Sequence, residues 1–416
     1  MSFPARPALR VVLPLLMLTP TTGAVAQTIE PPPSFNAAQI RGIACVGPNY
    51  TVLTPVRSDG LMRNYVLTTP YGNLSIAGDA MLRMRLNELQ ALALLEKVSG
   101  SDTFAKSLAQ AGLNPLKYTG RLIINPLGTV KDTFAGIGAM FGRIGSGIHN
   151  AGKTPDNAMA SLLGVTGERR ELAATYGVDP YTDFPPLDAI LKQLSEAAAL
   201  GGLTVSGALL VVPGAAGIVA SNLSTANKLN NVGIEELARK YTAAQILDLN
   251  RGRLTAMGVT PDLNAALLAN KHYTPIDMAA MVAALDSMAG VEGRDVFVTH
   301  AAEADARSSA FFMRRLAELM AKDHRSRPYM RIVALGGLPF AITRDGRVVT
   351  AAPIDALSWT ADTAARFGSF TATRRQISPN AKGELKITGM ATALATRQLK
   401  ASGWSVNSIT PIELTR

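Results

Sequence analysis

Cysteine and histidine are scarce in this chain. Cys45 is the only cysteine, and there are four histidines among 416 residues. A single cysteine cannot form an intramolecular disulfide, so the fold has to be stabilised by packing. Cys45 has apolar neighbours and no base nearby in sequence, which predicts a small buried hydrophobe and not a nucleophile. The histidines are far apart, and none has a second His or Cys at zinc-ligand spacing, so we expect no metal site and no cofactor.

Familiar catalytic and nucleic-acid motifs are missing as well. The sequence contains neither the G-x-S-x-G of a nucleophile elbow nor the H-E-x-x-H of zinc proteases. Aromatic residues are only 6% of the chain, and the basic residues are spread along it without a dense run of basic and aromatic side chains. This distribution is not typical of a nucleic-acid surface, so nucleic acid is not an expected partner.

One stretch does match a nucleotide-binding motif. Residues 147–154, GIHNAGKT, fit the pattern G-x-x-x-x-G-K-[ST] with Gly147, Gly152, Lys153 and Thr154 at its defining positions. A working phosphate loop follows a buried strand, whereas the residues before this one have helical spacing and Pro155 follows it directly. No apolar strand ending in Asp is evident to orient magnesium. We interpret the match as a glycine helix stop before a new helix, and expect no bound nucleotide.

The N-terminus has the pattern of a secretory signal peptide over residues 1–26. Arg6 and Arg10 precede a short apolar run, and Ala24 and Ala26 form a small-x-small cleavage site. The apolar run is shorter than the ~20 residues that span a bilayer. The formal charge is +10, of which the two arginines contribute two, leaving +8 on the mature chain, a balance that favours anionic surfaces. The expected location is the periplasm or the membrane-associated cell envelope.

The pattern of the mature chain predicts an α+β fold in three regions. Residues 27–120 form an N-terminal α+β region, in which short strands precede a strong helix that starts near Asp79 as N-cap and ends at Gly100. Residues 121–290 form a predominantly helical middle. Residues 291–416 form a C-terminal α/β domain with a mixed sheet, in which Asp295–Thr299 is expected to be a strand and Asp345-Gly346 a type I′ hairpin turn.

Two glycine-rich apolar segments stand out in the helical middle. Val130–His149 holds one apolar stripe for about five helical turns, beside a row of small residues that permits close helix packing. Ala197–Ser221 belongs to a run of 31 residues without charge. Its length and apolarity meet the criterion for a membrane span, but its glycines and Pro213 fit a buried helical hairpin equally well. Both alternatives stay open for the second segment.

Candidate catalytic residues are few. Asp179 and Asp183 share the loop GVDPYTDFPPL and could work as a carboxylate pair or bind calcium. Their spacing lacks the full calcium-loop pattern, so two solvated turn carboxylates are the simpler interpretation. His300 ends the expected strand Asp295–Thr299, a common place for functional residues in α/β units, although a lone histidine is more often structural. These three residues are the weak candidates for a catalytic site.

Three stretches resemble exported proteobacterial proteins that carry no assigned activity: YVLTTPYGNLSIAGDAMLRMRLNEL, GVDPYTDFPPL and PIDALSWT. Together with the signal peptide, the resemblance covers most of the mature chain and implies an exported location and nothing more. The leading hypothesis is a non-enzymatic envelope protein with a structural, binding or membrane-associated role, its partner an anionic membrane surface or another envelope protein. The alternative is a periplasmic hydrolase with a site between the helical middle and the C-terminal α/β domain.

Overall fold

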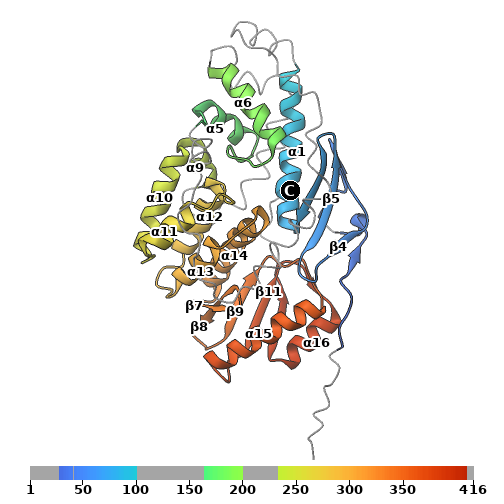
Figure 1. Cartoon of the computed structure of the whole chain (residues 1–416), viewed down its shortest axis with the longest axis vertical. Helices are drawn as coiled ribbons and strands as arrows, with labels where there is room; N and C mark the ends of the chain where they lie inside the picture. Colours follow the sequence, from blue (N-terminus) through green and yellow to red (C-terminus); the bar gives the residue numbers. More distant parts are fainter. Residues whose placement is uncertain (1–27, 41, 101–163, 200–232, 410–416) are drawn as a thin grey trace, which may run out of the picture.

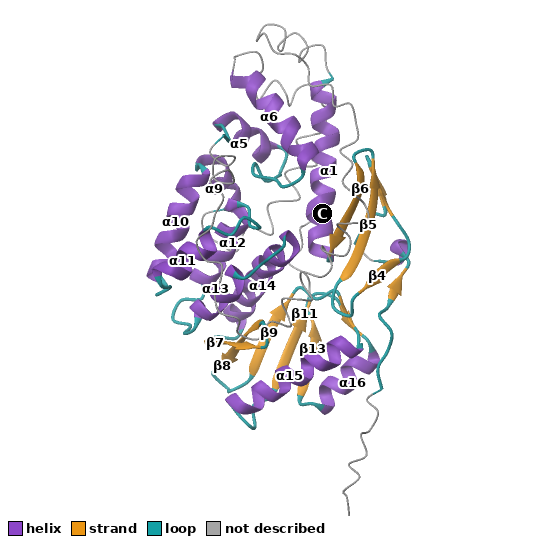
Figure 2. Ribbon diagram, viewed as in Figure 1, coloured by secondary structure: helices purple, strands orange, loops and turns teal. Residues whose placement is uncertain are grey.

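The computed structural model describes residues 28–40, 42–100, 164–199 and 233–409 (Figure 1). The signal peptide with Ala24 and Ala26, the phosphate-loop match at Gly147, Gly152, Lys153 and Thr154, and the segment Val130–His149 lie outside these residues. So does Ala197–Ser221 apart from its first three residues. The described chain is α+β, as predicted, with strands at the N-terminus, helices in the middle and a mixed sheet at the C-terminus (Figure 2).

The N-terminal sheet is antiparallel and has β5 at its centre. Its strand order is β1-β4-β5-β3-β2, and β6 pairs along β5. Alternating residues of β5 and β6, among them Tyr65, Leu67 and Ile76, are buried against the first helix. The strands are β1 Ser34–Phe35, β2 Val46–Gly47, β3 Tyr50–Val52, β4 Val56–Ser58, β5 Arg63–Thr69 and β6 Gly72–Ala77.

The long helix α1, Asp79–Ser99, covers this sheet and ends at the C-cap Gly100. Leu82, Leu86, Leu89 and Leu92 follow each other at helical spacing and form its apolar stripe, and all four are buried. The stripe also packs against α6, Pro185–Ala199, which lies beside α5, Gly167–Thr175. Cys45 is half-buried at the edge of the same core and not fully enclosed as expected.

The helical middle surrounds one almost completely buried helix, α12. Of its residues Pro275–Asp286, only the last is exposed, and the helix packs between α10 and α14. The buried capping-box residues Thr274 and Asp277 fix its N-terminus, where Thr274 Oγ1 accepts the Asp277 N–H. The helices here are α9 Ile234–Lys240, α10 Ala243–Ala256, α11 Pro261–Leu268, α12, α13 Arg294–Ala302 and α14 Arg307–Ser326.

The C-terminal sheet is mixed, with strand order β13-β11-β9-β8-β7. β9, β11 and β13 are parallel, β8 pairs antiparallel with β9, and β7 pairs antiparallel with β8. The two crossovers run through α15, Ala361–Ile377, and α16, Ala393–Ala401, which lie in front of the sheet in Figure 2. The strands are β7 Tyr329–Leu335, β8 Leu338–Thr343, β9 Val348–Ala352, β11 Gly383–Ile387 and β13 Trp404–Ser408, and a small parallel pair joins β10 Ala356–Leu357 to β12 Met390–Ala391.

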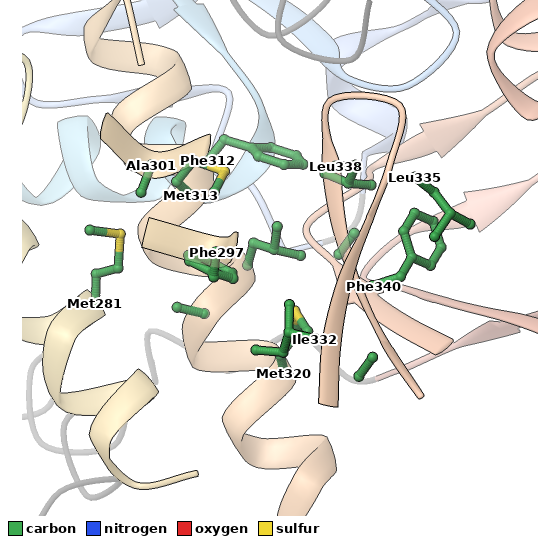
Figure 3. Close-up of a cluster of buried hydrophobic side chains, with 14 of the residues drawn as sticks. Met281, Phe297, Ala301, Phe312, Met313, Met320, Ile332, Leu335, Leu338 and Phe340 are labelled. Atoms are coloured by element: carbon green, nitrogen blue, oxygen red, sulfur yellow. The ribbon is translucent and has the colours of Figure 1, made fainter. Parts of the chain in front are cut away.

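The helical middle and the C-terminal sheet share one hydrophobic core. Phe297 of α13 and Met320 of α14 lie near Ile332 of β7, and Phe340 of β8 belongs to the same cluster (Figure 3). Met281 of α12 belongs to the same cluster. Residues on both sides of the expected boundary between 290 and 291 therefore contribute to the same hydrophobic core.

Two local predictions were wrong. Asp295–Thr299 is part of the helix α13 and not a strand, because Phe297, Val298 and Ala301 place one face in the core at helical spacing. A short apolar run cannot be assigned to helix or strand from periodicity alone. The hairpin turn is not type I′, since Gly346 alone in it has a positive φ, 77°. The Thr343 N–H donates to the Arg347 carbonyl, which leaves residues 344–346 as a three-residue loop in which the Thr343 carbonyl accepts the Gly346 N–H.

Candidate functional site

The loop between α5 and α6 brings the two candidate aspartates to the meeting point of three other helices. Asp183 contacts Arg85 of α1 and Arg307 of α14, while Asp179 contacts Thr274 at the start of α12. We call the charged residues gathered here the loop junction. They are Arg85 and Glu88 of α1, Asp179 and Asp183 of the loop, Asp277 of α12, and Arg307, Arg314, Arg315 and Glu318 of α14.

Asp183 is the ionised, solvent-facing end of the loop junction. Its Oδ1 lies 3.2 Å from an Arg85 nitrogen and its Oδ2 lies 3.4 Å from Arg307 Nε, and its side chain is 35% exposed. Burial alone would raise the pKa of this carboxyl, but the guanidinium groups of Arg85 and Arg307 outweigh it and lower the pKa to about 2. Asp183 is therefore an ion-pair partner and not the freely solvated turn carboxylate that the sequence favoured.

Asp179 is held mainly by neutral donors. Its Oδ2 accepts the Thr274 hydroxyl at 2.6 Å and its Oδ1 accepts the Tyr181 N–H at 2.8 Å. Burial raises the pKa of Asp179 to about 6, and the nearby charge of Asp277 adds to the effect. Asp277 behaves in the opposite way, because contacts of 2.6 Å to both Arg307 and Arg314 lower its pKa despite its burial.

Glu88 lies beneath the loop, where it is almost fully buried. Its Oε2 accepts an Arg85 N–H and its Oε1 accepts the Thr182 hydroxyl, both at 2.6 Å. Burial raises the pKa of Glu88 to about 7, against the opposing effect of the Arg85 guanidinium. In the loop junction, carboxyl groups that titrate near neutrality thus lie beside others that stay ionised.

His300 does not join this site. It lies on α13, where its Nδ1 is 3.6 Å from Glu303 on the same helix, and burial lowers its pKa against the effect of Glu303. Within the described ranges, no hydrogen bond or ion pair connects His300 to Asp179 or Asp183. The structure therefore unites two of the three candidate residues and separates the third.

A second charge cluster lies at the N-terminus of α1. The helix begins at Asp79 itself, after the N-cap Gly78, which has no side chain to accept a helical N–H. Asp355, from the segment after β9, supplies the acceptor, since its Oδ2 accepts the N–H groups of Asp79 (3.0 Å) and Arg63 (3.2 Å). Burial, with the nearby Asp79 charge, raises the pKa of Asp355 well above its usual value. We call this arrangement the Asp355 cap.

The Asp79 carboxylate completes the second cluster. It lies 2.6 Å from an Arg63 guanidinium nitrogen and accepts the Tyr65 hydroxyl at the same distance. Gly389 lies so close to the Asp355 backbone that an added Cβ would be 1.8 Å from the Asp355 carbonyl oxygen. Through the hydrogen bond from the Asp79 N–H to Asp355, the N-terminus of α1 is thus joined directly to the C-terminal α/β unit.

Sequence reasoning missed Glu88, Asp277, Arg307 and Asp355. The pattern T-P-I-D at 274–277 is a recognisable capping-box signal and could have placed Asp277 at a helix start. Glu88 and Arg307 carry no such local signal, because their partners come from distant parts of the chain. The stretches YVLTTPYGNLSIAGDAMLRMRLNEL, GVDPYTDFPPL and PIDALSWT supply much of both clusters: Tyr65, Asp79, Arg85 and Glu88 from the first, Asp179 and Asp183 from the second, and Asp355 from the third.

Among the residues that the structure describes, no group of three or more His, Cys, Asp or Glu side chains is arranged to hold a metal ion. In the same residues, no helix combines the length and the apolar character needed to cross a bilayer. No protein-family model, curated protein or solved structure matches the chain. Function therefore has to be argued from the contacts of the two clusters and from the sequence.

Proposed function

We propose that this chain is an exported, non-enzymatic protein of the cell envelope with a structural or binding role. The observation that supports it is the engagement of the candidate catalytic carboxylates inside the chain. Both oxygens of Asp179 accept hydrogen bonds, and both oxygens of Asp183 face guanidinium groups. A general acid or base has to present an oxygen to its substrate, and these oxygens are engaged by groups of the protein itself: Arg85, Arg307, the Thr274 hydroxyl and the Tyr181 N–H.

The rest of the loop junction fits a structural role in the same way. Asp277 pairs with Arg307 and Arg314, and Glu88 is divided between Arg85 and Thr182. Removing one partner from such a buried group leaves an uncompensated charge, which costs far more than the pair itself contributes. The loop junction therefore ties α1, α12 and α14 to one loop.

The proposed location rests on the sequence. The signal-peptide pattern over residues 1–26 favours export, and the charge of +8 on the mature chain favours an anionic envelope surface. Anionic lipids attract each nearby Lys or Arg with about 1 kcal/mol, and salt screens the attraction.

Vesicle binding and fractionation test the proposal together. The mature chain should sediment with anionic vesicles at low salt and be released at high salt, while neutral vesicles serve as the control. In the bacterium, the chain should leave the cytosol, and bulky replacements at Ala24 and Ala26 should keep the leader attached. Equal binding to neutral vesicles would contradict the surface role, and recovery wholly in the cytosol would contradict export.

A periplasmic hydrolase is the second candidate, favoured by one specific observation. Glu88 and Asp179 have pKa values of about 7 and about 6, close to the ionised Asp183, and such separated values are typical of acid and base pairs. A panel of ester, phosphoester and glycoside substrates tests it. Hydrolysis that is lost in Asp179→Asn and retained in the exposed control Asp248→Asn would favour the enzyme over the structural role.

A further inference from the structure

The excess of basic over acidic residues falls in one part of the chain. Although Lys and Arg are spread along the sequence, residues 322–400 contain thirteen of them against five Asp and Glu, a net charge of +8. Residues 27–416 as a whole also carry +8. The rest of the mature chain is therefore balanced, and its attraction to an anionic surface has to come from the C-terminal part.

That excess collects at one edge of the C-terminal sheet. Three registered pairs define the edge: Tyr329 with Thr343, Val348 with Gly383, and Gly383 with Trp404. They place the starts of β7, β9, β11 and β13 and the hairpin between β8 and β9 side by side. At the opposite edge, the segment after β9 holds Asp355, which binds the N-terminus of α1. The first edge therefore points away from α1, and the sheet lies at the lower end of the molecule in Figure 1.

Five exposed bases at this edge, one from each of five chain segments, form what we call the basic edge. They are Arg325 in the last turn of α14, Arg344 in the β8–β9 hairpin, Arg375 in the last turn of α15, Lys382 directly before β11 and Lys400 in the last turn of α16. Within the described ranges, none of the five forms an ion pair. Because neighbouring strands are ~4.8 Å apart, the five strands of the sheet extend over about 20 Å.

The carboxyl groups nearest to the basic edge are already paired with other bases. The pairs are Glu384 with Arg327 and Arg347, Asp345 with Arg347, and Asp323 with Lys386. Glu384 and Asp323 are also buried. These acids therefore do not neutralise the five residues of the basic edge.

Arg374 fixes three of the five bases relative to one another. Its buried guanidinium donates to three carbonyl groups, those of Ala381, Ser402 and Gly403. Lys382 follows the first of these carbonyls, Lys400 lies just before the other two, and Arg375 follows Arg374 itself. Neutral groups thus hold like charges together on this side of the sheet.

Helix dipoles explain only part of this arrangement. A base in the last turn of a helix is favourable by itself, which accounts for Arg325, Arg375 and Lys400 taken singly. Arg344 and Lys382 are not on helices. Like charges along one edge repel each other, so their convergence does not stabilise the fold, whereas it does favour contact with an anion.

The basic edge suits a plane of lipid phosphates better than a nucleic acid. Among the described large hydrophobic side chains that are exposed, the only aromatic one is Tyr241, at the end of α9 and outside the basic edge. Proteins that bind single strands use aromatic side chains as stacking platforms. Met330, which is 52% exposed, lies one residue after the start of β7 and provides an apolar group that a lipid interface can accept.

We propose that the basic edge is the surface with which this protein docks on an anionic phospholipid bilayer. The lower end of the molecule then meets the headgroups, and α1 with the N-terminal sheet points away from them. The inference rests on the envelope role proposed above and assigns the residues and the orientation that serve it.

Two variants with the same change of net charge test the assignment. The edge variant combines Arg375→Gln, Lys382→Gln and Lys400→Gln. The control variant combines Lys97→Gln, Lys192→Gln and Lys271→Gln, which are exposed positions on other elements. Sedimentation with vesicles of equal parts phosphatidylglycerol and phosphatidylcholine measures the affinity. The edge variant should bind on the order of a hundredfold more weakly, because each lost charge contributes a factor of about five.

The control variant should lose less than about threefold, since its charges lie farther from the bilayer than the Debye length of ~10 Å at 0.1 M salt. A footprint of the wild type avoids any effect of substitution on folding. Acetylation of Lys382 and Lys400 should fall severalfold when vesicles are added, whereas acetylation of Lys97 and Lys192 should not change.

The possible failures can be told apart. If the wild type binds but the edge and control variants bind equally well, or if vesicles do not protect Lys382 and Lys400, the basic edge is not the docking surface and the envelope role still stands. A wild type that fails to sediment with anionic vesicles would overturn both. Tighter binding to duplex DNA than to vesicles at equal phosphate concentration would overturn the choice of lipid as the partner.

Discussion

The loop junction and the Asp355 cap both hold α1, but different chemistry neutralises their carboxyl groups. In the loop junction, guanidinium groups of Arg85, Arg307 and Arg314 face the acids. In the Asp355 cap, two backbone N–H groups bind a carboxyl whose pKa is raised well above its usual value. The first cluster depends on charge, whereas the second requires only an acceptor of the right shape. Substitutions can test this difference.

The largest effect is expected from Arg307→Ala. Arg307 faces both Asp277, which is almost completely buried, and Asp183. Its loss leaves a buried carboxylate short of positive charge, which should lower the free energy of unfolding by about 3–5 kcal/mol. Denaturant unfolding measures the change. The matched variant Arg251→Ala breaks an exposed pair with Asp248 and should cost at most about 1 kcal/mol. Equal effects in the two variants would mean that the loop junction does not depend on charge.

Asp355→Ala should have the next largest effect. The change leaves the N–H groups of Arg63 and Asp79 without their acceptor, and a buried unsatisfied donor costs about 1–3 kcal/mol. Thermal or denaturant unfolding measures the loss. A stability equal to that of the wild type would contradict the capping role of Asp355.

Asparagine at position 355 sharpens the comparison. Asp355→Asn keeps a neutral side chain with one acceptor oxygen, so it should retain both hydrogen bonds and cost less than about 1 kcal/mol. Asp183→Asn removes a charge that two guanidinium groups share and should be tolerated less well at neutral pH. If Asp355→Asn destabilised the protein more than Asp183→Asn, the Asp355 cap and not the loop junction would be the cluster that depends on charge.

The acid limb of the stability curve should show the smallest effect. The pKa of Asp183 is lowered to about 2, so its ion pairs stabilise the fold above its ordinary value and are lost as the pH falls toward 2. Asp183→Asn should therefore flatten the fall in stability between pH 4 and pH 2, measured by unfolding at each pH. An unchanged slope would show that the pKa of Asp183 is not lowered in the folded chain.

Local patterns in the sequence were sufficient to predict most helices and strands, but they could not predict the loop junction or the Asp355 cap. The leucine stripe of α1 follows from spacing, because its burial repeats every three or four residues. A strand such as β9 is buried at every position and is recognised instead as a short apolar run next to turn residues. The run around Phe297 was too short to separate helix from strand. Asp355 could not be linked to α1, since 276 residues separate it from Asp79 in the chain. Asp179 and Asp183 were found because they share a loop, but their partners were not.

The interior position of α12 has a consequence for how the polypeptide can be divided. A helix with almost no polar face is sheltered only while α10 and α14 flank it. Any fragment that stops before α14 would expose the apolar surface of α12 to water and would aggregate. The central helices must therefore be produced together if either half of the protein is to remain in solution.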